Sequence, residues 1–135
     1  TIKKPYIIVH IIILLSWAVF LLFKGNPPSG ILIVLFFIIG YGYGASALTF
    51  AVVRQSFPLK ESGIVSGFAN TGGFLSAVLL PSIFGIVLDQ YETITGSIGN
   101  GYYYGFYTPV IFSIIGLMGV LSIKEKYLQE NEIMR

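Results

Sequence analysis

The chain has 135 residues, of which 55% are hydrophobic and only 10% are charged, and its mean hydropathy is +0.83. Soluble domains carry about 25% charged residues, so this composition excludes an ordinary soluble protein and favours a membrane protein. The net charge of +2, without a dense Lys/Arg cluster, gives no sign of a nucleic-acid-binding surface.

Four apolar runs are long enough to cross a membrane, which takes about 18 to 20 residues. They cover about residues 6–23, 31–53, 64–88 and 106–123. The sequence therefore predicts an all-α membrane protein with four transmembrane helices, followed by a charged tail at residues 124–135.

Three polar segments separate these runs, and we expect each of them to be a loop. Residues 24–30 read KGNPPSG and are rich in turn formers. Residues 54–63 contain a proline and three charges, and residues 89–105 contain four glycines.

The Lys and Arg residues are distributed unevenly among these loops and the termini. If both termini and the second loop lie on one side of the membrane, that side holds seven of the eight: Lys3, Lys4, Arg54, Lys60, Lys124, Lys126 and Arg135. Lys24 alone lies on the other side. Since cytoplasmic loops carry an excess of Lys and Arg, we predict a multi-pass protein of the cell membrane with both termini and the tail in the cytoplasm.

The second run ends in the small and polar sequence GYGYGASALTF. Gly40 and Gly44 form a G-x-x-x-G pair, a spacing that lets two membrane helices approach closely. Buried tyrosine hydroxyls need hydrogen-bond partners. A polar cavity would therefore suit this helix, and its candidate lining residues are Tyr41, Tyr43, Ser46 and Thr49.

The third run carries small and polar residues at steps of three or four, along one face of a helix. They are Gly63, Ser66, Gly67, Asn70, Gly73 and Ala77. Gly63 and Gly67 form a second G-x-x-x-G pair. We expect this face, which we call the small-residue face, to press or slide against another protein helix.

Asn70 lies inside the third run, where an unpaired amide would cost several kcal/mol. It must face a partner helix, water or a ligand, and both static packing and a role in gating are open. Pro81 removes one helical hydrogen bond and, with Gly85, permits a bend in the helix.

An enzyme is unexpected. The chain has one histidine and no cysteine, and its apolar runs hold no carboxylate, which leaves no nucleophile–base pair, zinc site or bis-histidine haem site. We therefore expect no metal and no cofactor. His10 lies near the start of the first run, and the sequence favours an interfacial position for it over a proton relay.

Together these features resemble the last third of a major facilitator superfamily transporter. KKP before the first run resembles the basic end of the loop that precedes the ninth helix. FPLKESGIVSGFANTGGFLSAVLLPSIFGIVLD resembles the junction of the tenth and eleventh helices, with its P-x-x-x-G and acidic residue at Pro81, Gly85 and Asp89. KEKYLQENEIMR resembles a cytoplasmic C-terminus.

The resemblance implies that the four runs are helices nine to twelve of a twelve-helix fold. It implies that the tenth lines the central cavity with Tyr41, Tyr43, Ser46 and Thr49. It implies that the eleventh packs at the interface between the two halves, where Asn70, Gly72 and Gly73 contact substrate or form a gate. The expected partners are the lipid bilayer, the missing N-terminal helices and a small-molecule substrate.

The N-x-G-G-F run from Asn70 to Phe74 resembles the oxyanion branch of the superfamily, including nitrate/nitrite transporters, and carboxylate transporters have similar runs. The implied substrate is an organic anion or an oxyanion. Two alternatives are a small four-helix membrane protein and a non-transporting membrane subunit. Four-helix multidrug exporters, however, depend on a carboxylate inside a span, and none is found here.

Overall fold

The computed structural model describes residues 2–123. In this part of the chain there are six helices and no strand: α1 (Lys3–Leu22), α2 (Ser29–Gly44), α3 (Ser46–Ser56), α4 (Leu59–Thr95), α5 (Ile98–Gly105) and α6 (Tyr107–Ser122). By length and composition, α1, α2 with α3, α4, and α5 with α6 can each cross a membrane. The predicted all-α fold with four spans is confirmed. The predicted tail at 124–135 lies outside the described residues.

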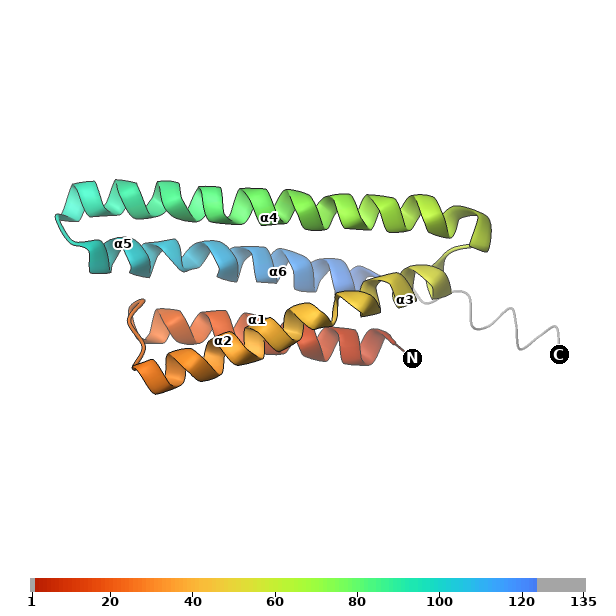
Figure 1. Ribbon diagram of the computed structural model, residues 1–135, viewed down its shortest axis with the longest axis horizontal. Helices are drawn as coiled ribbons and strands as arrows, with labels where there is room; N and C mark the ends of the chain where they lie inside the picture. The colour runs from red at the N-terminus through yellow and green to blue at the C-terminus, as the bar shows by residue number, and fades with distance from the viewer. Residues whose placement is uncertain (1, 124–135) are drawn as a thin grey trace.

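Figure 1 shows α4 alongside α5 and α6, with α1 on their other side and α2 crossing α1. α4 packs along α5 and α6, α6 packs along α1, and α1 packs along α2. α3 turns away from the line of α2 and reaches α4 at the end of the bundle opposite α5. The N-terminus lies toward the end that holds the α3–α4 turn.

The turn between α1 and α2 depends on a left-handed backbone. Lys24 has a φ of 52° and Gly25 a φ of 79°. A Cβ atom on Gly25 would lie only 2.8 Å from the backbone nitrogen of Tyr103, so this position needs glycine for its contact with α5 as well as for its φ. Pro28 and Pro58 immediately precede α2 and α4, where proline's missing N–H costs no helical hydrogen bond.

The second span is broken at Ala45, between α2 and α3. The preceding GYGYG sequence weakens the helix, because glycine is a poor helix former. The backbone N–H of Ala45 donates to the Gly42 carbonyl at 3.0 Å, and the N–H of Leu48 donates to the Ala45 carbonyl at 2.8 Å. These i→i+3 bonds satisfy backbone groups that a break would otherwise leave unpaired inside a membrane.

The expectation that residues 89–105 form a loop is wrong. α4 continues to Thr95 and ends at Gly96, which adopts a φ of 63°, and α5 follows at once. The glycines serve helix packing here. A Cβ atom on Gly101 would lie 2.8 Å from the Leu88 carbonyl oxygen, and one on Gly105 would lie 3.0 Å from the Phe84 ring. The expected loop at 54–63 is also mostly helical, since α3 ends at Ser56 and α4 begins at Leu59.

The core of the described residues sits near the α1–α2 turn. Phe20, Leu35 and Ile39 are buried there, and Trp17 and Phe106 pack against them. The rings of Phe20 and Phe106 are stacked with centroids 4.4 Å apart. This aromatic contact ties α1 to the junction of α5 and α6, whereas α4 contributes no buried residue.

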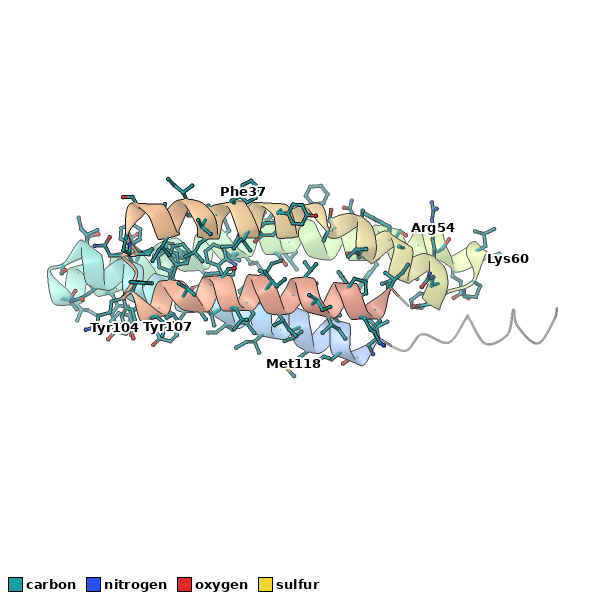
Figure 2. The ribbon with its side chains drawn as sticks, turned by 90° about the horizontal axis from the view of Figure 1, so that it is seen from below. Phe37, Arg54, Lys60, Tyr104, Tyr107 and Met118 are labelled. Atoms are coloured by element: carbon teal, nitrogen blue, oxygen red, sulfur yellow. The ribbon has the colours of Figure 1, made fainter. Side chains whose placement is uncertain are left out.

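The two ends of the bundle differ in chemistry. Figure 2 shows Arg54 and Lys60 toward one end and Tyr104 and Tyr107 toward the other. At the basic end, the Lys3 ammonium donates to the carbonyl oxygens of Leu121 and Ile123, which caps the end of α6. This segregation is the arrangement that the predicted topology requires. Which end faces the cytoplasm stays a prediction.

Candidate functional site

A polar pocket of about 230 Å³ lies where α1, α2, α4 and α6 meet. Besides Trp17, its hydrogen-bonding side chains are His10, Tyr43, Ser76 and Ser113, one from each of these helices. Ser76 lies near the midpoint of α4, so the pocket is close to the middle of the bundle. At that depth hydrocarbon surrounds the helices, and such groups need partners from protein, water or a ligand.

The orientation of the His10 ring is set by its own helix. Its Nδ1 atom lies 3.0 Å from the carbonyl oxygen of Tyr6. A carbonyl oxygen can only accept, so Nδ1 is the donor in this contact. The Tyr6 ring meets the imidazole edge-on at a centroid distance of 4.6 Å. Gly116 lies beside the ring: a Cβ atom added to it would lie 3.5 Å from Cδ2 and 3.8 Å from Nε2 of His10.

The remaining polar groups of the pocket are only partly paired. The Ser76 hydroxyl donates to the Gly72 carbonyl at 3.0 Å, which leaves its oxygen free to accept. Among the described residues, the hydroxyls of Tyr43 and Ser113 have no hydrogen-bond partner. The pocket thus offers hydrogen-bonding groups that include two uncommitted hydroxyls, which suits a small hydrogen-bonding solute or water.

The four residues predicted on the second span do not share one cavity. Tyr43 lines the polar pocket, whereas Tyr41 lines a separate apolar groove against α1 and is 81% exposed. Residues two apart on a helix point to nearly opposite sides, which separates the two tyrosines. Thr49 is bonded to Tyr6, with 2.7 Å between the two hydroxyl oxygens, and this bond joins α3 to α1. Ser46 is exposed at the start of α3.

The small-residue face of α4 meets no other helix of the described chain at close range. A Cβ atom on Gly63, Gly67, Gly72, Gly73 or Gly85 would find no neighbouring atom within 4 Å. Asn70 is exposed, and its side chain has no hydrogen bond with residues 2–123. α4 also runs through Pro81 without a break. The predicted roles of these residues stay predictions, and they require a partner from outside the described residues.

A comparison with protein families identifies the chain, because residues 2–132 match the model of the Major Facilitator Superfamily. The chain belongs to this superfamily. No curated protein and no solved structure matches the chain. The superfamily consists of secondary transporters, whose repeats rock around a site near the membrane midplane. The predicted family is therefore confirmed, whereas the assignment to helices nine to twelve stays a prediction.

In this superfamily member, close helix contact occurs at other glycines than the predicted G-x-x-x-G pair. A Cβ atom on Gly40 or Gly44 would meet nothing within 4 Å. One on Gly42 would lie 2.8 Å from two side-chain carbons of Ile13, so α2 approaches α1 closely at Gly42. Gly40 and Gly44 share one helix face and Gly42 lies on another, and the spacing alone does not show which of these faces meets α1.

The sequence did not predict the pocket residues His10, Ser76 and Ser113. One signal was available for His10: it lies seven residues after the start of α1, about 11 Å along the helix. Its interfacial position stays a prediction. Ser113 is one of the few polar residues in an otherwise apolar span. Within residues 2–123, no group of three or more His, Cys, Asp or Glu side chains could hold a metal ion.

Proposed function

We propose that this chain is the C-terminal four-helix part of a secondary active transporter that moves a small solute across the cell membrane by alternating access. The observation that carries the proposal is the family match, which extends over residues 2–132 of a chain with four membrane-crossing segments. The resemblance at the sequence level supports helices nine to twelve. The remaining helices of the fold would then be supplied from outside this sequence.

The exposed small-residue face of α4 supports the proposal that further helices of the fold lie outside this sequence. A helix with no buried residue, an exposed amide at Asn70 and open glycines at Gly67 and Gly73 has the surface expected of an inner helix whose neighbours are missing. The substrate path would run between this face and the N-terminal helices. Tyr41, Tyr43, Ser46, Thr49, Asn70, Gly72 and Gly73 remain its candidate residues.

For the substrate, we propose an organic anion or an oxyanion such as nitrate or nitrite. The resemblance of the N-x-G-G-F run at Asn70 to the oxyanion branch supports this class, and the Asn70 side-chain amide can donate hydrogen bonds of the kind that anions accept. No Lys or Arg lines the polar pocket, and Arg54 lies near the end of the second span. The cationic side chains that neutralise the anion would therefore belong to the preceding helices.

Uptake into vesicles tests the proposal. The protein expressed from its complete reading frame should contain further hydrophobic spans upstream and should accumulate labelled nitrate, nitrite or a small carboxylate. The 135-residue chain alone should accumulate none of them. Transport by a defined oligomer of the 135-residue chain, or a complete reading frame without further spans, would overturn the proposal in favour of a small four-helix membrane protein. A well-folded complete protein that transports only cations or neutral solutes would overturn the substrate class.

A further inference from the structure

A second and larger cavity lies at the tyrosine-rich end of the bundle, between α4 and the helical segment formed by α5 and α6. It is a groove of about 510 Å³. From α4 it is lined by Ile83, Val87 and Tyr91, and from α5 and α6 mainly by Tyr104, Tyr107, Ile111 and Phe112. Its lining overlaps that of the polar pocket at Phe112 alone, and none of the residues predicted to line the substrate path is part of it.

The chemistry of the groove changes along its length. Ile83 and Val87 are one helical turn apart on one wall, and Ile111 and Phe112 form the corresponding part of the other. About 12 Å along α4 from Ile83, at Tyr91, the lining becomes aromatic. The rings of Tyr91 and Tyr104 stack there with centroids 3.9 Å apart. The groove therefore has an apolar interior and a rim of phenol hydroxyls.

The rim can donate hydrogen bonds. The hydroxyl oxygens of Tyr103 and Tyr107 lie 3.1 Å apart, and this bond uses one of their two hydroxyl hydrogens. The other hydrogen is free for an acceptor. Tyr91 and Tyr104 carry further hydroxyls at the rim, and no charged residue lines the groove.

The groove opens onto exposed apolar surface of membrane-crossing segments. Both of its walls belong to segments long and apolar enough to cross a membrane. On α6, Ile111 in the groove is 52% exposed, and Ile115 one turn beyond it is 61% exposed. Toward the rim, Tyr104 and Tyr107 lie at the end of the bundle opposite Arg54 and Lys60 (Figure 2). Tyrosines take similar positions in the aromatic belts at membrane interfaces. The apolar interior of the groove and its hydroxyl-bearing rim follow the same order as the hydrocarbon and headgroup layers of a bilayer.

From this match we propose that the groove binds one membrane phospholipid. An acyl chain lies along Ile83, Val87 and Ile111, and the ester or phosphate oxygens accept hydrogen bonds from the tyrosine hydroxyls at the rim. Because the lining holds no Lys or Arg, zwitterionic and anionic phospholipids should bind about equally well.

Native mass spectrometry of the detergent-solubilised protein, expressed from its complete reading frame, tests the proposal. Phosphatidylcholine is added in slight molar excess, and we expect one tightly bound lipid per protein. Ile111→Trp fills the groove and should lower the bound fraction at least fivefold. Ile115→Trp is the matched control on the same face of α6, one turn outside the groove, and should leave it unchanged.

Tyr107→Phe provides a second variant that keeps the shape of the groove. It removes a rim hydroxyl, so lipid should dissociate at lower collision energy than from the parent protein. A photoactivatable acyl chain on phosphatidylcholine should label peptides that contain Ile83–Tyr91 or Ile111. Equal lipid retention by the Ile111→Trp and Ile115→Trp variants would overturn the proposal. Labelling spread over all lipid-facing helices would also overturn it. The same holds if another helix of the protein covers the groove and excludes the probe.

Discussion

Polar residues inside the membrane-crossing segments fall into two groups, according to whether the described chain gives them a partner. Thr49 is paired with Tyr6, and the hydroxyls of Thr71 and Ser76 donate to carbonyls one turn earlier in α4. Asn70, which immediately precedes Thr71, has no side-chain hydrogen bond within residues 2–123. An amide requires more partners than a hydroxyl, and helix carbonyls alone satisfy it poorly. Asn70 is therefore the residue from which a functional role is most strongly expected.

We predict that Asn70→Leu in the complete protein lowers transport about tenfold or more while insertion and expression are kept. The substitution removes hydrogen bonds worth about 1–3 kcal/mol when their partners are left unpaired, and leucine favours the membrane. Thr71→Val is the control, because the Thr71 hydroxyl is already bonded to the Gly67 carbonyl at 3.0 Å. Initial uptake rates measure the effect. Normal rates and affinity in a well-expressed Asn70→Leu protein would leave Asn70 with a packing role alone.

A second residue-scale prediction concerns the bond between Tyr6 and Thr49. Tyr6→Phe and Thr49→Val should each lower the free energy of unfolding by about 1 kcal/mol, because each removes the same inter-helix hydrogen bond. The double variant should cost little more than either single one. A double-mutant cycle of denaturation in mild detergent measures the coupling. Fully additive losses would show that the two hydroxyls do not interact in solution.

At the scale of elements, α5 is the helix that the sequence predicts least well. Its sequence, IGNGYYYG, has three glycines and an asparagine, residues that favour turns. It is helical because Gly101 and Gly105 let its backbone rest on α4, and this tertiary contact outweighs the weak local preference. The same contact determines where α6 begins and how the groove at the tyrosine-rich end is shaped.

We predict that Gly101→Ala separates α5 from α4, whereas Gly99→Ala on the same helix does not. A Cβ atom at position 101 would lie 2.8 Å from the Leu88 carbonyl oxygen, which is backbone and cannot rotate away. At position 99 the nearest atom is the Ser97 hydroxyl oxygen at 3.7 Å, an ordinary contact. The first substitution should cost about 1–3 kcal/mol of stability. Thermal unfolding of both variants checks the difference, and equal melting temperatures would contradict the contact.

The membrane-crossing segments could be predicted from the sequence, whereas the polar pocket and the close helix contacts could not. The four spans were predicted, because a bilayer demands about 20 apolar residues in succession and this demand is visible in any sequence. The polar pocket was not, because it needs His10, Ser76 and Ser113 from three different spans. Their proximity depends on the order in which the helices pack. Likewise, Gly42 differs from Gly40 and Gly44 only in what lies opposite it.

At the scale of the whole molecule, the bundle has a basic end and a tyrosine-rich end. The α3–α4 turn and the start of α1 place Arg54, Lys60 and Lys3 at the first, and the α4–α5 turn lies at the second. The positive-inside rule assigns the basic end to the cytoplasm. This assignment can be tested directly, because the chain contains no cysteine.

We predict that Ile94→Cys reacts with a membrane-impermeant maleimide in intact cells and that Lys60→Cys does not. Both side chains are exposed, so the difference would report the side of the membrane and not burial. After cell lysis both should react. Other cysteines of the complete protein would first be replaced. Labelling of Lys60→Cys from outside, with Ile94→Cys protected, would reverse the orientation and remove the alignment with helices nine to twelve.

The length of α4 has a further consequence. Its 37 residues span about 55 Å, and the apolar part at 64–88 alone spans about 37 Å, against a hydrocarbon core of about 30 Å. Hydrophobic mismatch of this sign is relieved by tilting the helix or by thickening the bilayer around it. In a thicker bilayer α4 would stand more upright and alter its angle to whatever packs on its small-residue face. The thickness of the membrane would then influence how α4 packs against its partner.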